Sequence, residues 1–190
     1  MFSRFAIHYL HILTMFSDPP HTIEQFELQS GARVADFGAG AGELSLLAAR
    51  AVGESGRVYA IEVQKPLVER LLSRARDERL LNLEALWGDI ERARGTHLKD
   101  GLVDAVIVSN VLFQAEDKEG LVFEAKRILK PGGKALLVDW SDSFGHTGPH
   151  PEQVIKESAA RELFEKAGFR FVKKIEAGEH HYGLIFKKSV

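Results

Sequence analysis

The chain has 190 residues, 45% of them apolar and 27% charged, with a net charge of −2 and no cysteine. This composition is typical of a globular protein, and the length predicts one domain over residues 1–190, with residues 1–17 as an N-terminal helical extension. The lack of cysteine excludes disulfides, thiolate metal sites and cysteine nucleophiles. The small net charge gives no general attraction to nucleic acid or anionic membranes, and no apolar run reaches the ~18 residues that span a bilayer. We therefore expect a cytoplasmic protein.

The N-terminal segment Phe2–Phe16 is mostly apolar but is interrupted by Arg4 and by histidines. A signal peptide is not predicted, because the apolar run is broken and no small-residue cleavage site precedes Asp18-Pro19-Pro20. We expect a helix that packs on the domain and partly covers a ligand cleft. The segment could instead make peripheral membrane contact, bind a partner, or form a disordered end.

A glycine-rich turn follows the first predicted strand, in the sequence Asp36-Phe37-Gly38-Ala39-Gly40-Ala41-Gly42. A helix is predicted directly after it, from Glu43 to about Val52. Glycine permits backbone angles and close contacts that a Cβ would block, and the first helical turn offers unpaired N–H groups to an anionic group. A dinucleotide fingerprint, Gly-x-Gly-x-x-Gly, would need glycine at position 43, where glutamate stands. The spacing therefore favours S-adenosylmethionine over a dinucleotide as the ligand. The alternative is an ordinary glycine-rich strand-to-helix turn with no ligand.

Acidic residues end the next two predicted strands as well. Glu62 closes the strand that begins at Arg57, and Asp89 follows the strand Leu83–Trp87. A carboxylate at position 62 can bind both hydroxyls of a ribose, and Asp89 is placed to bind an adenine amine, with Ile90 against the ring. Asp89 could instead cap the following segment. Because open α/β sheets bind ligands at the carboxyl ends of their strands, three acids at three such ends indicate one site.

The remaining pattern alternates strands and helices. Strands centre on residues 35, 59, 85, 106 and 137; one helix opens at Pro66, and another, ending near Leu129, is stopped by Pro131-Gly132-Gly133. A helix from about Pro151 to Ala167 precedes two closely spaced strands, Phe169–Ile175 and His181–Lys187, which can only pair antiparallel. The predicted fold is α/β: a Rossmann-like, seven-stranded, mainly parallel sheet with a C-terminal antiparallel hairpin and helices on both faces.

Several of these segments carry a family resemblance. They are the glycine-rich turn and the segments Val103–Asn110, Leu129–Lys134, Val138-Asp139-Trp140, Leu163–Phe169 and His181–Lys187. In order and spacing, over roughly residues 18 to 188, the chain resembles class I S-adenosylmethionine-dependent methyltransferases, and within them the small ubiquinone/menaquinone-biosynthesis-like type. The resemblance implies a methionine-end site at Asp36, Gly38 and Gly40, a ribose contact at Glu62, an adenine contact at Asp89, and Asn110 beside the sulfonium. The full expected cofactor-binding set is Asp36, Gly38, Gly40, Gly42, Glu62, Val63, Asp89, Ile90 and Asn110.

Catalytic residues are harder to predict. A sulfonium is already an activated methyl donor, so positioning in a dry site matters most, and a general base helps only if the acceptor must lose a proton. Asp139, His146 and His181 are candidates for that base, although Asp139 could simply cap a turn and His181 could be a surface or core residue. His146 and His150 have the spacing of a metal pair but no third ligand nearby, so no metal site is predicted. Residues Ser141–Pro149 predict a mobile loop over the acceptor side.

The predicted function is methyl transfer from S-adenosylmethionine, with S-adenosylhomocysteine as product, to a small-molecule acceptor. A second reading is an RNA 2′-O-methyltransferase similar to fibrillarin, suggested by Pro151-Glu152-Gln153-Val154 and the strand near His181. Asp139 stands where that family would place a catalytic lysine, which disfavours it. The sequence is also compatible with a nicotinamide-dependent oxidoreductase and with a non-catalytic S-adenosylmethionine-binding module.

Overall fold

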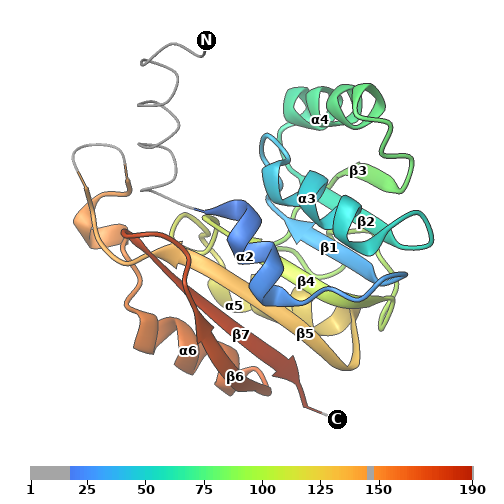
Figure 1. Cartoon of the computed structure of the whole chain (residues 1–190). Coiled ribbons are helices and arrows are strands. Elements are labelled where there is room, and N and C mark those ends of the chain that lie inside the picture. Colours follow the sequence, from blue (N-terminus) through green and yellow to red (C-terminus); the bar gives the residue numbers. More distant parts are fainter. Residues whose placement is uncertain (1–17, 145–147, 190) are drawn as a thin grey trace.

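The computed structural model describes residues 18–144 and 148–189 and contains a seven-stranded sheet in the order β3-β2-β1-β4-β5-β7-β6 (Figure 1). All neighbouring strands pair parallel except β7, which is antiparallel to both β5 and β6. The strands are β1 (Arg33–Phe37), β2 (Arg57–Glu62), β3 (Leu83–Trp87), β4 (Val103–Ser109), β5 (Leu129–Trp140), β6 (Phe169–Ile175) and β7 (His181–Lys188). The predicted Rossmann-like sheet with its C-terminal antiparallel hairpin is confirmed.

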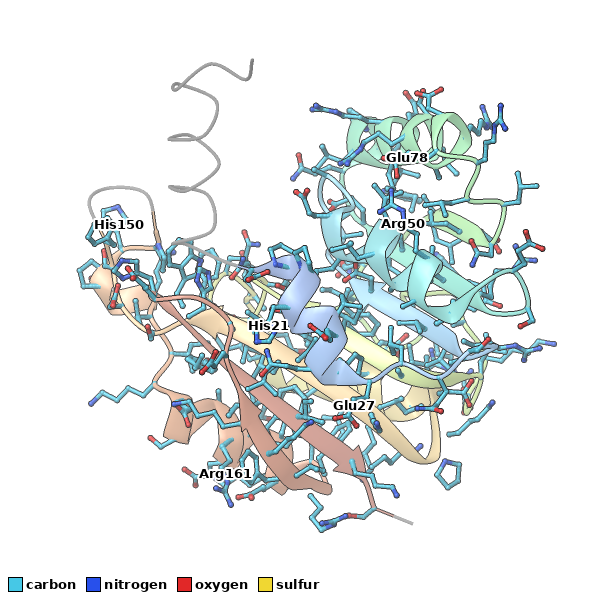
Figure 2. The ribbon with its side chains drawn as sticks, in the orientation of Figure 1. His21, Glu27, Arg50, Glu78, His150 and Arg161 are labelled. Atoms are coloured by element: carbon cyan, nitrogen blue, oxygen red, sulfur yellow. The ribbon has the colours of Figure 1, made fainter. Side chains whose placement is uncertain are left out.

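Helices lie on both faces of the sheet. They are α2 (Pro19–Phe26), α3 (Glu43–Val52), α4 (Lys65–Asp77), α5 (Lys118–Ile128) and α6 (Glu157–Lys166), with a short 3-10 helix, η1 (Pro151–Gln153). Side chains of α2, α3 and α4 form one apolar core with one face of the sheet, and those of α5 and α6 form a second core with the other. Arg50 of α3 forms an ion pair with Glu78 at the end of α4 (Figure 2). No helix in the described part of the chain is long and apolar enough to cross a membrane.

The two cores follow from the alternation of side chains along the central strands. In β1, Val34 points into the α2–α3–α4 core, while Ala35 and Phe37 point into the α5–α6 core. In β4, Ile107 points into the α2–α3–α4 core and Val108 into the α5–α6 core. All of these side chains are fully buried. A strand buried on both faces needs a mostly apolar sequence; β4 provides it from Ala105 to Val108, and in β1 the buried exception is Asp36.

The strand order reverses direction beside β1. From β1 the chain runs outward through β2 to β3, then crosses to β4 on the other side of β1. Ligands of open α/β sheets bind outside the carboxyl ends of the strands at such a switch point. The fold therefore places the glycine-rich turn after β1 and the end of β4 on either side of one crevice.

Helix α2 is an element that the sequence analysis did not predict. Asp18 caps it, accepting a hydrogen bond from the His21 N–H at 3.0 Å, and prolines occupy its first positions. This is a common helix-start pattern, since an aspartate oxygen satisfies a free N–H and proline fits the first turn. The expected helical extension over residues 1–17 lies outside the described residues.

One predicted helix is wrong in its extent. The helix expected over 151–167 is divided into η1 and α6, because Val154 and Lys156 are extended and Ile155 packs against the α5–α6 core. The helix expected to end near Leu129 ends at Ile128, with Leu129 as its C-cap and as the first residue of β5. The pairing of β5 with β4 shifts from Val103↔Leu129 to Ala105↔Lys134, so the Pro-Gly-Gly segment forms an irregularity within the strand pair. Proline disfavours helical backbone in the residue before it, which agrees with a helix that stops ahead of Pro131.

Candidate cofactor site

The three glycines of the turn after β1 all have positive φ, but they serve different contacts. A Cβ on Gly38 would lie 2.6 Å from Val111 Cγ2, and one on Gly42 would lie 2.0 Å from Leu71 Cδ1. Glycine is required at both positions because other parts of the protein pack there. A Cβ on Gly40 would meet only the Gly38 carbonyl oxygen, at 3.9 Å. Gly40 therefore leaves open space beside the crevice, whereas Gly42 begins α3 and packs on α4.

Asp36, near the end of β1, is 3% exposed. Its Oδ2 accepts a hydrogen bond from Ser45 Oγ of α3 at 2.5 Å. Burial raises the pKa of Asp36 to about 7; the bond from Ser45 opposes this rise and the negative charge of Glu62 adds to it. A buried carboxylate beside a second acid is a site that a positively charged ligand group would stabilise.

Glu62, at the end of β2, connects the glycine-rich turn to its own strand. Its Oε2 accepts from the Gly40 N–H at 3.0 Å, and its Oε1 accepts from the Gln64 N–H at 2.9 Å. The side chain is 6% exposed. Each carboxylate oxygen has a further lone pair, so Glu62 can also accept from two hydroxyls of a ligand. Val63, which follows it, is 58% exposed at the mouth of the crevice.

Asp89 has two contacts within its own segment. Its Oδ1 accepts from the Glu91 N–H at 3.1 Å, and its Oδ2 pairs with Arg92 Nε at 2.9 Å. Asp89 thus caps the segment after β3 and also lines the crevice together with Ile90. The two roles considered for this residue from the sequence are compatible in the structure.

Asn110, directly after β4, has a φ of +55°, which is unusual for a residue other than glycine. Its N–H donates to the Val138 carbonyl oxygen at 2.9 Å. Its side-chain Oδ1 is buried and has no hydrogen-bond partner among the described residues. Buried polar atoms are nearly always paired, so this oxygen is suited to accept a bond from a ligand.

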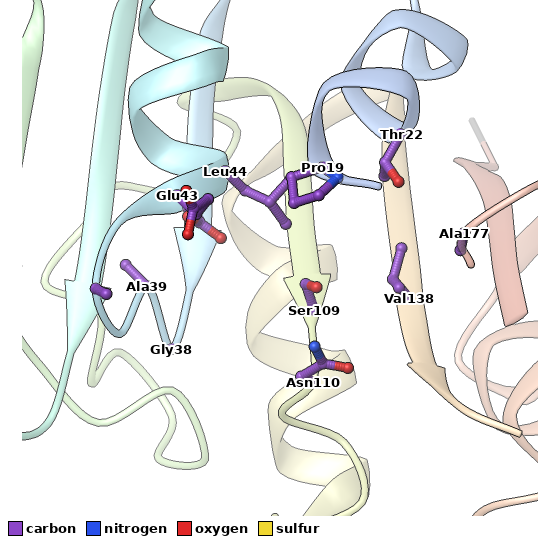
Figure 3. Close-up of a pocket in the computed structure, with 12 residues that line it drawn as sticks. Pro19, Thr22, Gly38, Ala39, Glu43, Leu44, Ser109, Asn110, Val138 and Ala177 are labelled. Carbon is purple, nitrogen blue, oxygen red and sulfur yellow. The ribbon is translucent and has the colours of Figure 1, made fainter. Parts of the chain in front are cut away.

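Two cavities meet at the switch point, and Figure 3 shows the smaller one. The larger has a volume of about 520 Å³ and is lined by Glu62, Val63, Asp89 and Ile90, among others. The smaller, of about 210 Å³, extends toward α2 and includes Asp36, Pro19 and Thr22. Both share Gly38, Ser109 and Asn110. One chamber thus has the acids expected for a nucleoside, the other has the acid expected for a cationic group, and Asn110 lies where they join.

Further residues of the site were not predicted from the sequence. The structure adds Ser45, which bonds Asp36, and Pro19 and Thr22 of α2, which line the smaller cavity. Val111 and Gln114, in the loop after β4, line the larger cavity. The Asp18-Pro19-Pro20 pattern could have revealed α2, whereas the other contacts join residues that are distant in sequence.

The catalytic candidates lie in different settings. Asp139 is 1% exposed and lines neither cavity. The ring of His181 lies tilted against Trp140, with centroids 4.2 Å apart. His146 lies outside the described residues. Among those described, no group of three or more histidine or acidic residues is arranged to hold a metal ion.

Part of the expected mobile loop contacts the body of the protein. Asp142 accepts from His180 Nδ1 at 2.8 Å, and Phe144 stacks on the His180 ring with centroids 4.2 Å apart. A Cβ on Gly148 would lie 3.0 Å from Trp140, so the backbone packs closely on that ring. Residues 145–147 lie outside the described part of the chain, and closure of this loop on ligand binding stays a prediction.

The sheet order, the glycine-rich turn and the acids ending β1, β2 and β3 together define a class I S-adenosylmethionine-dependent methyltransferase. Comparison with known proteins agrees. Residues 28–183 match the profile of the methyltransferase domain family, and the chain belongs to this family. S-adenosylmethionine is its cofactor.

Solved structures and curated relatives are similar over much of the chain. A SAM-dependent methyltransferase from Aquifex aeolicus is 29% identical with a TM-score of 0.83, covering 98% of this chain and 99% of that one. A ubiquinone/menaquinone biosynthesis C-methyltransferase from Haemophilus ducreyi is 31% identical over 124 residues, 63% of this chain and 46% of that protein. A demethylmenaquinone methyltransferase from Geobacillus is 24% identical over 147 residues, 74% of this chain and 62% of that protein. The chain thus spans about half the length of these curated relatives.

Proposed function

We propose that this protein transfers the methyl group of S-adenosylmethionine to a small-molecule acceptor. In this proposal, the acids at Glu62 and Asp89 and the apolar Ile90 hold the adenosine in the larger cavity. Asp36 receives the cationic end in the smaller cavity. Bound there, the cofactor supplies an activated methyl group. The chain's contribution is then to fix the donor geometry and to exclude water, which can lower a barrier by roughly 7–11 kcal/mol.

The observation that carries the choice of a small acceptor is the chemistry of the cavity walls. The described residues that line the two cavities include no lysine or arginine. RNA-binding sites depend on cationic side chains that contact the phosphate backbone. Near the join, the walls toward α2 and β5 are instead apolar, with Pro19, Leu44, Val138 and Ala177. Such walls suit an uncharged, largely apolar acceptor.

The names of the relatives support the same class. The Haemophilus and Geobacillus relatives are named as quinone-biosynthesis methyltransferases, one of them as a C-methyltransferase. An arsenic(III) S-adenosylmethionine methyltransferase from Chlamydomonas reinhardtii is 25% identical, with a TM-score of 0.68 over 85% of this chain and 64% of that one. These acceptors differ, but each is far smaller than an RNA. We propose a quinol or phenol ring as the first acceptor type to test.

The test is an assay of S-adenosylhomocysteine formation by the purified chain, with S-adenosylmethionine and three acceptor sets: quinols and phenols, small thiols and arsenite, and total RNA. We expect turnover with one of the small-molecule sets and none with RNA. Turnover with RNA alone would replace this proposal with an RNA methyltransferase. Tight donor binding without turnover in any set would favour a non-catalytic binding module.

The donor site itself is tested by Glu62→Ala. The change removes a carboxylate that holds the glycine-rich turn and is proposed to bind the ribose. Because hydrogen bonds to a charged group contribute about 1.5–3 kcal/mol, we expect affinity for S-adenosylhomocysteine to fall by at least tenfold. Calorimetric titration measures the affinity, with Glu165→Ala on the exposed face of α6 as the control. Wild-type affinity in Glu62→Ala would mean that the donor binds elsewhere.

A further inference from the structure

The buried carboxylate of Asp139, near the end of β5, binds a neighbouring loop. Its Oδ2 accepts from the Phe113 N–H at 3.1 Å, and its Oδ1 accepts from the Trp140 N–H at 2.8 Å. The Leu112 N–H also favours the charged form of this carboxylate. Both oxygens are therefore occupied by main-chain donors. A carboxylate with 1% exposure and no place in either cavity wall is poorly placed to take a proton from an acceptor.

The loop that Asp139 binds, residues 110–115, forms one wall of the donor cavities. Asn110, Val111, Gln114 and Ala115 all line the larger cavity. Val111 also packs against the glycine-rich turn at Gly38, so the position of the loop sets the width between the two. A displacement of this loop would move the cavity wall and the Asn110 side chain together.

Most of the loop's remaining hydrogen bonds to described residues are internal. Gln114 Nε2 donates to the Asn110 carbonyl oxygen at 3.0 Å, and the Val111 carbonyl oxygen accepts from two N–H groups. Towards β5, the Asn110 N–H bonds Val138 at 2.9 Å. The positive φ of Asn110 is a left-handed conformation that few residues other than glycine and asparagine adopt readily. The bonds from Asp139 constrain the middle of the loop.

The groups around Asp139 determine its charge. Burial raises its pKa to about 6, while the main-chain bonds and the positive charge of Lys118 on α5 oppose the rise. Lys118 Nζ itself donates to the Ala115 carbonyl oxygen at 2.6 Å. On β7, Tyr182 is the register partner of Asp139, and its hydroxyl is buried with no partner among the described residues. We therefore expect Asp139 to be mainly charged at pH 8 and mainly neutral at pH 5, and only the charged form offers all its lone pairs to the loop.

We propose that Asp139 is a positioning residue of the donor site, which holds the loop 110–115, and with it Asn110, in the geometry that binds the donor. The inference rests on the proposed donor site but requires no knowledge of the acceptor. It gives Asp139 a role different from that of a catalytic base.

The test is calorimetric titration of S-adenosylhomocysteine with wild type and Asp139→Asn at pH 8, 7, 6 and 5. At pH 8 we expect the variant to bind at least tenfold more weakly, because the amide group presents N–H where the loop also presents N–H. The ratio of the two dissociation constants should fall toward one at pH 5, where wild-type Asp139 is neutral. Titration of Asp36 changes the donor affinity of wild type and of Asp139→Asn alike, so its effect cancels in the ratio of their dissociation constants. Asp142→Asn, the same change at an exposed position that bonds His180, is the matched control and should match wild type.

Two outcomes would overturn the proposal. Equal donor affinity of wild type and Asp139→Asn at pH 8 would show that the loop does not need the carboxylate. A ratio that stays constant from pH 8 to pH 5 would show a general structural defect without a role for the charge.

A second measurement needs neither the variant nor the ligand. Hydrogen exchange of the Leu112 and Phe113 amides in wild type, corrected for the intrinsic pH dependence, should show lower protection at pH 5 than at pH 8. Unchanged protection contradicts the proposal even if the variant does not fold. If wild type binds no S-adenosylhomocysteine while these amides lose protection, the donor assignment fails and the contact between Asp139 and the loop stands.

Discussion

Asp36, which we propose as a contact of the donor, lowers the stability of the protein at neutral pH because its carboxylate is buried. Its carboxylate is almost fully buried beside Glu62, and its pKa rises from 3.8 to about 7. Between those two pH values, the native state holds the proton more tightly than the unfolded chain does. The contribution of Asp36 to the free energy of unfolding is therefore present at acidic pH and is lost as the pH rises toward 7.

Replacing Asp36 by asparagine should separate its effect on stability from its effect on donor binding. At pH 8, where wild type buries a charge, we expect Asp36→Asn to raise the free energy of unfolding by on the order of 1–4 kcal/mol, and by less at pH 5. The same variant should bind the cationic donor more weakly. Urea unfolding at both pH values and calorimetric titration measure the two properties. A variant less stable than wild type at pH 8 would contradict the assigned burial cost.

The glycines of the turn give a second residue-scale prediction. Alanine at position 42 would place its Cβ 2.0 Å from Leu71, whereas alanine at position 40 would meet mainly open space. Both residues have positive φ, so both changes carry backbone strain. We expect Gly42→Ala to lower the free energy of unfolding by about 2–4 kcal/mol and Gly40→Ala by about 1 kcal/mol, as measured by urea unfolding. Gly40→Ala should instead bind the donor more weakly, because its methyl group enters the larger cavity. Equal losses of stability in the two variants would contradict these separate roles of Gly40 and Gly42.

At the scale of elements, a buried ion pair connects α5 to the segment between β3 and β4. Glu124 is 1% exposed and accepts from the Arg94 and Thr96 N–H groups, from Thr96 Oγ1 at 2.6 Å, and from Arg127 at 2.7 Å. Arg127 also donates to the Leu98 carbonyl oxygen at 2.9 Å. This segment starts at Asp89 and Ile90, so the ion pair anchors the loop that carries the proposed adenine contacts.

Removing Glu124 should therefore be costly. Glu124→Ala leaves Arg127 with only the exposed Asp100 as a carboxylate partner and leaves several N–H groups unpaired, and we expect a loss of about 3–5 kcal/mol in the free energy of unfolding at pH 7. The pKa of Glu124 is lowered to about 2, so its contribution should be lost as the pH falls from about 4.5 toward 2. Glu165→Ala, which breaks the exposed pair with Arg161, should cost less than ~0.5 kcal/mol. Urea unfolding measures the loss of stability in each variant. Equal losses for Glu124→Ala and Glu165→Ala would contradict the role assigned to the buried ion pair of Glu124.

At the scale of elements, the sequence predicted only those features whose signal lies within a short stretch of the chain. The strands, the turn and the acids at the strand ends could be predicted because each signal lies within about ten residues. The bonds of Asp139 to Phe113, and the contact of Gly38 with Val111, join different strands, and no periodicity predicts them. The helix wrongly expected over 151–167 has the same origin, since packing of Ile155 against the α5–α6 core outweighed local helix preference.

For the whole molecule, the proposed donor site lies between two groups of elements. Glu62 and Asp89 come from the β2–β3 side, and Asn110 comes from the β4–β5 side, with the glycine-rich turn between them. A ligand that contacts both sides binds the native state and not the unfolded chain, so it must stabilise the protein by mass action. This stabilisation can distinguish one cofactor from another, because only a ligand that fits both cavities contacts both sides of the site.

We expect S-adenosylhomocysteine at one hundred times its dissociation constant to raise the free energy of unfolding by about 2.7 kcal/mol. For a chain of this size, that corresponds to a rise in melting temperature of roughly 5–10 °C. NADH at the same concentration should have no effect, because the turn lacks the dinucleotide spacing. Thermal melts of wild type measure the change in melting temperature with each ligand. Gly40→Ala serves as the control, in which S-adenosylhomocysteine should raise the melting temperature much less. Stabilisation by NADH alone would overturn the cofactor assignment, since the same sheet edge would then bind a dinucleotide.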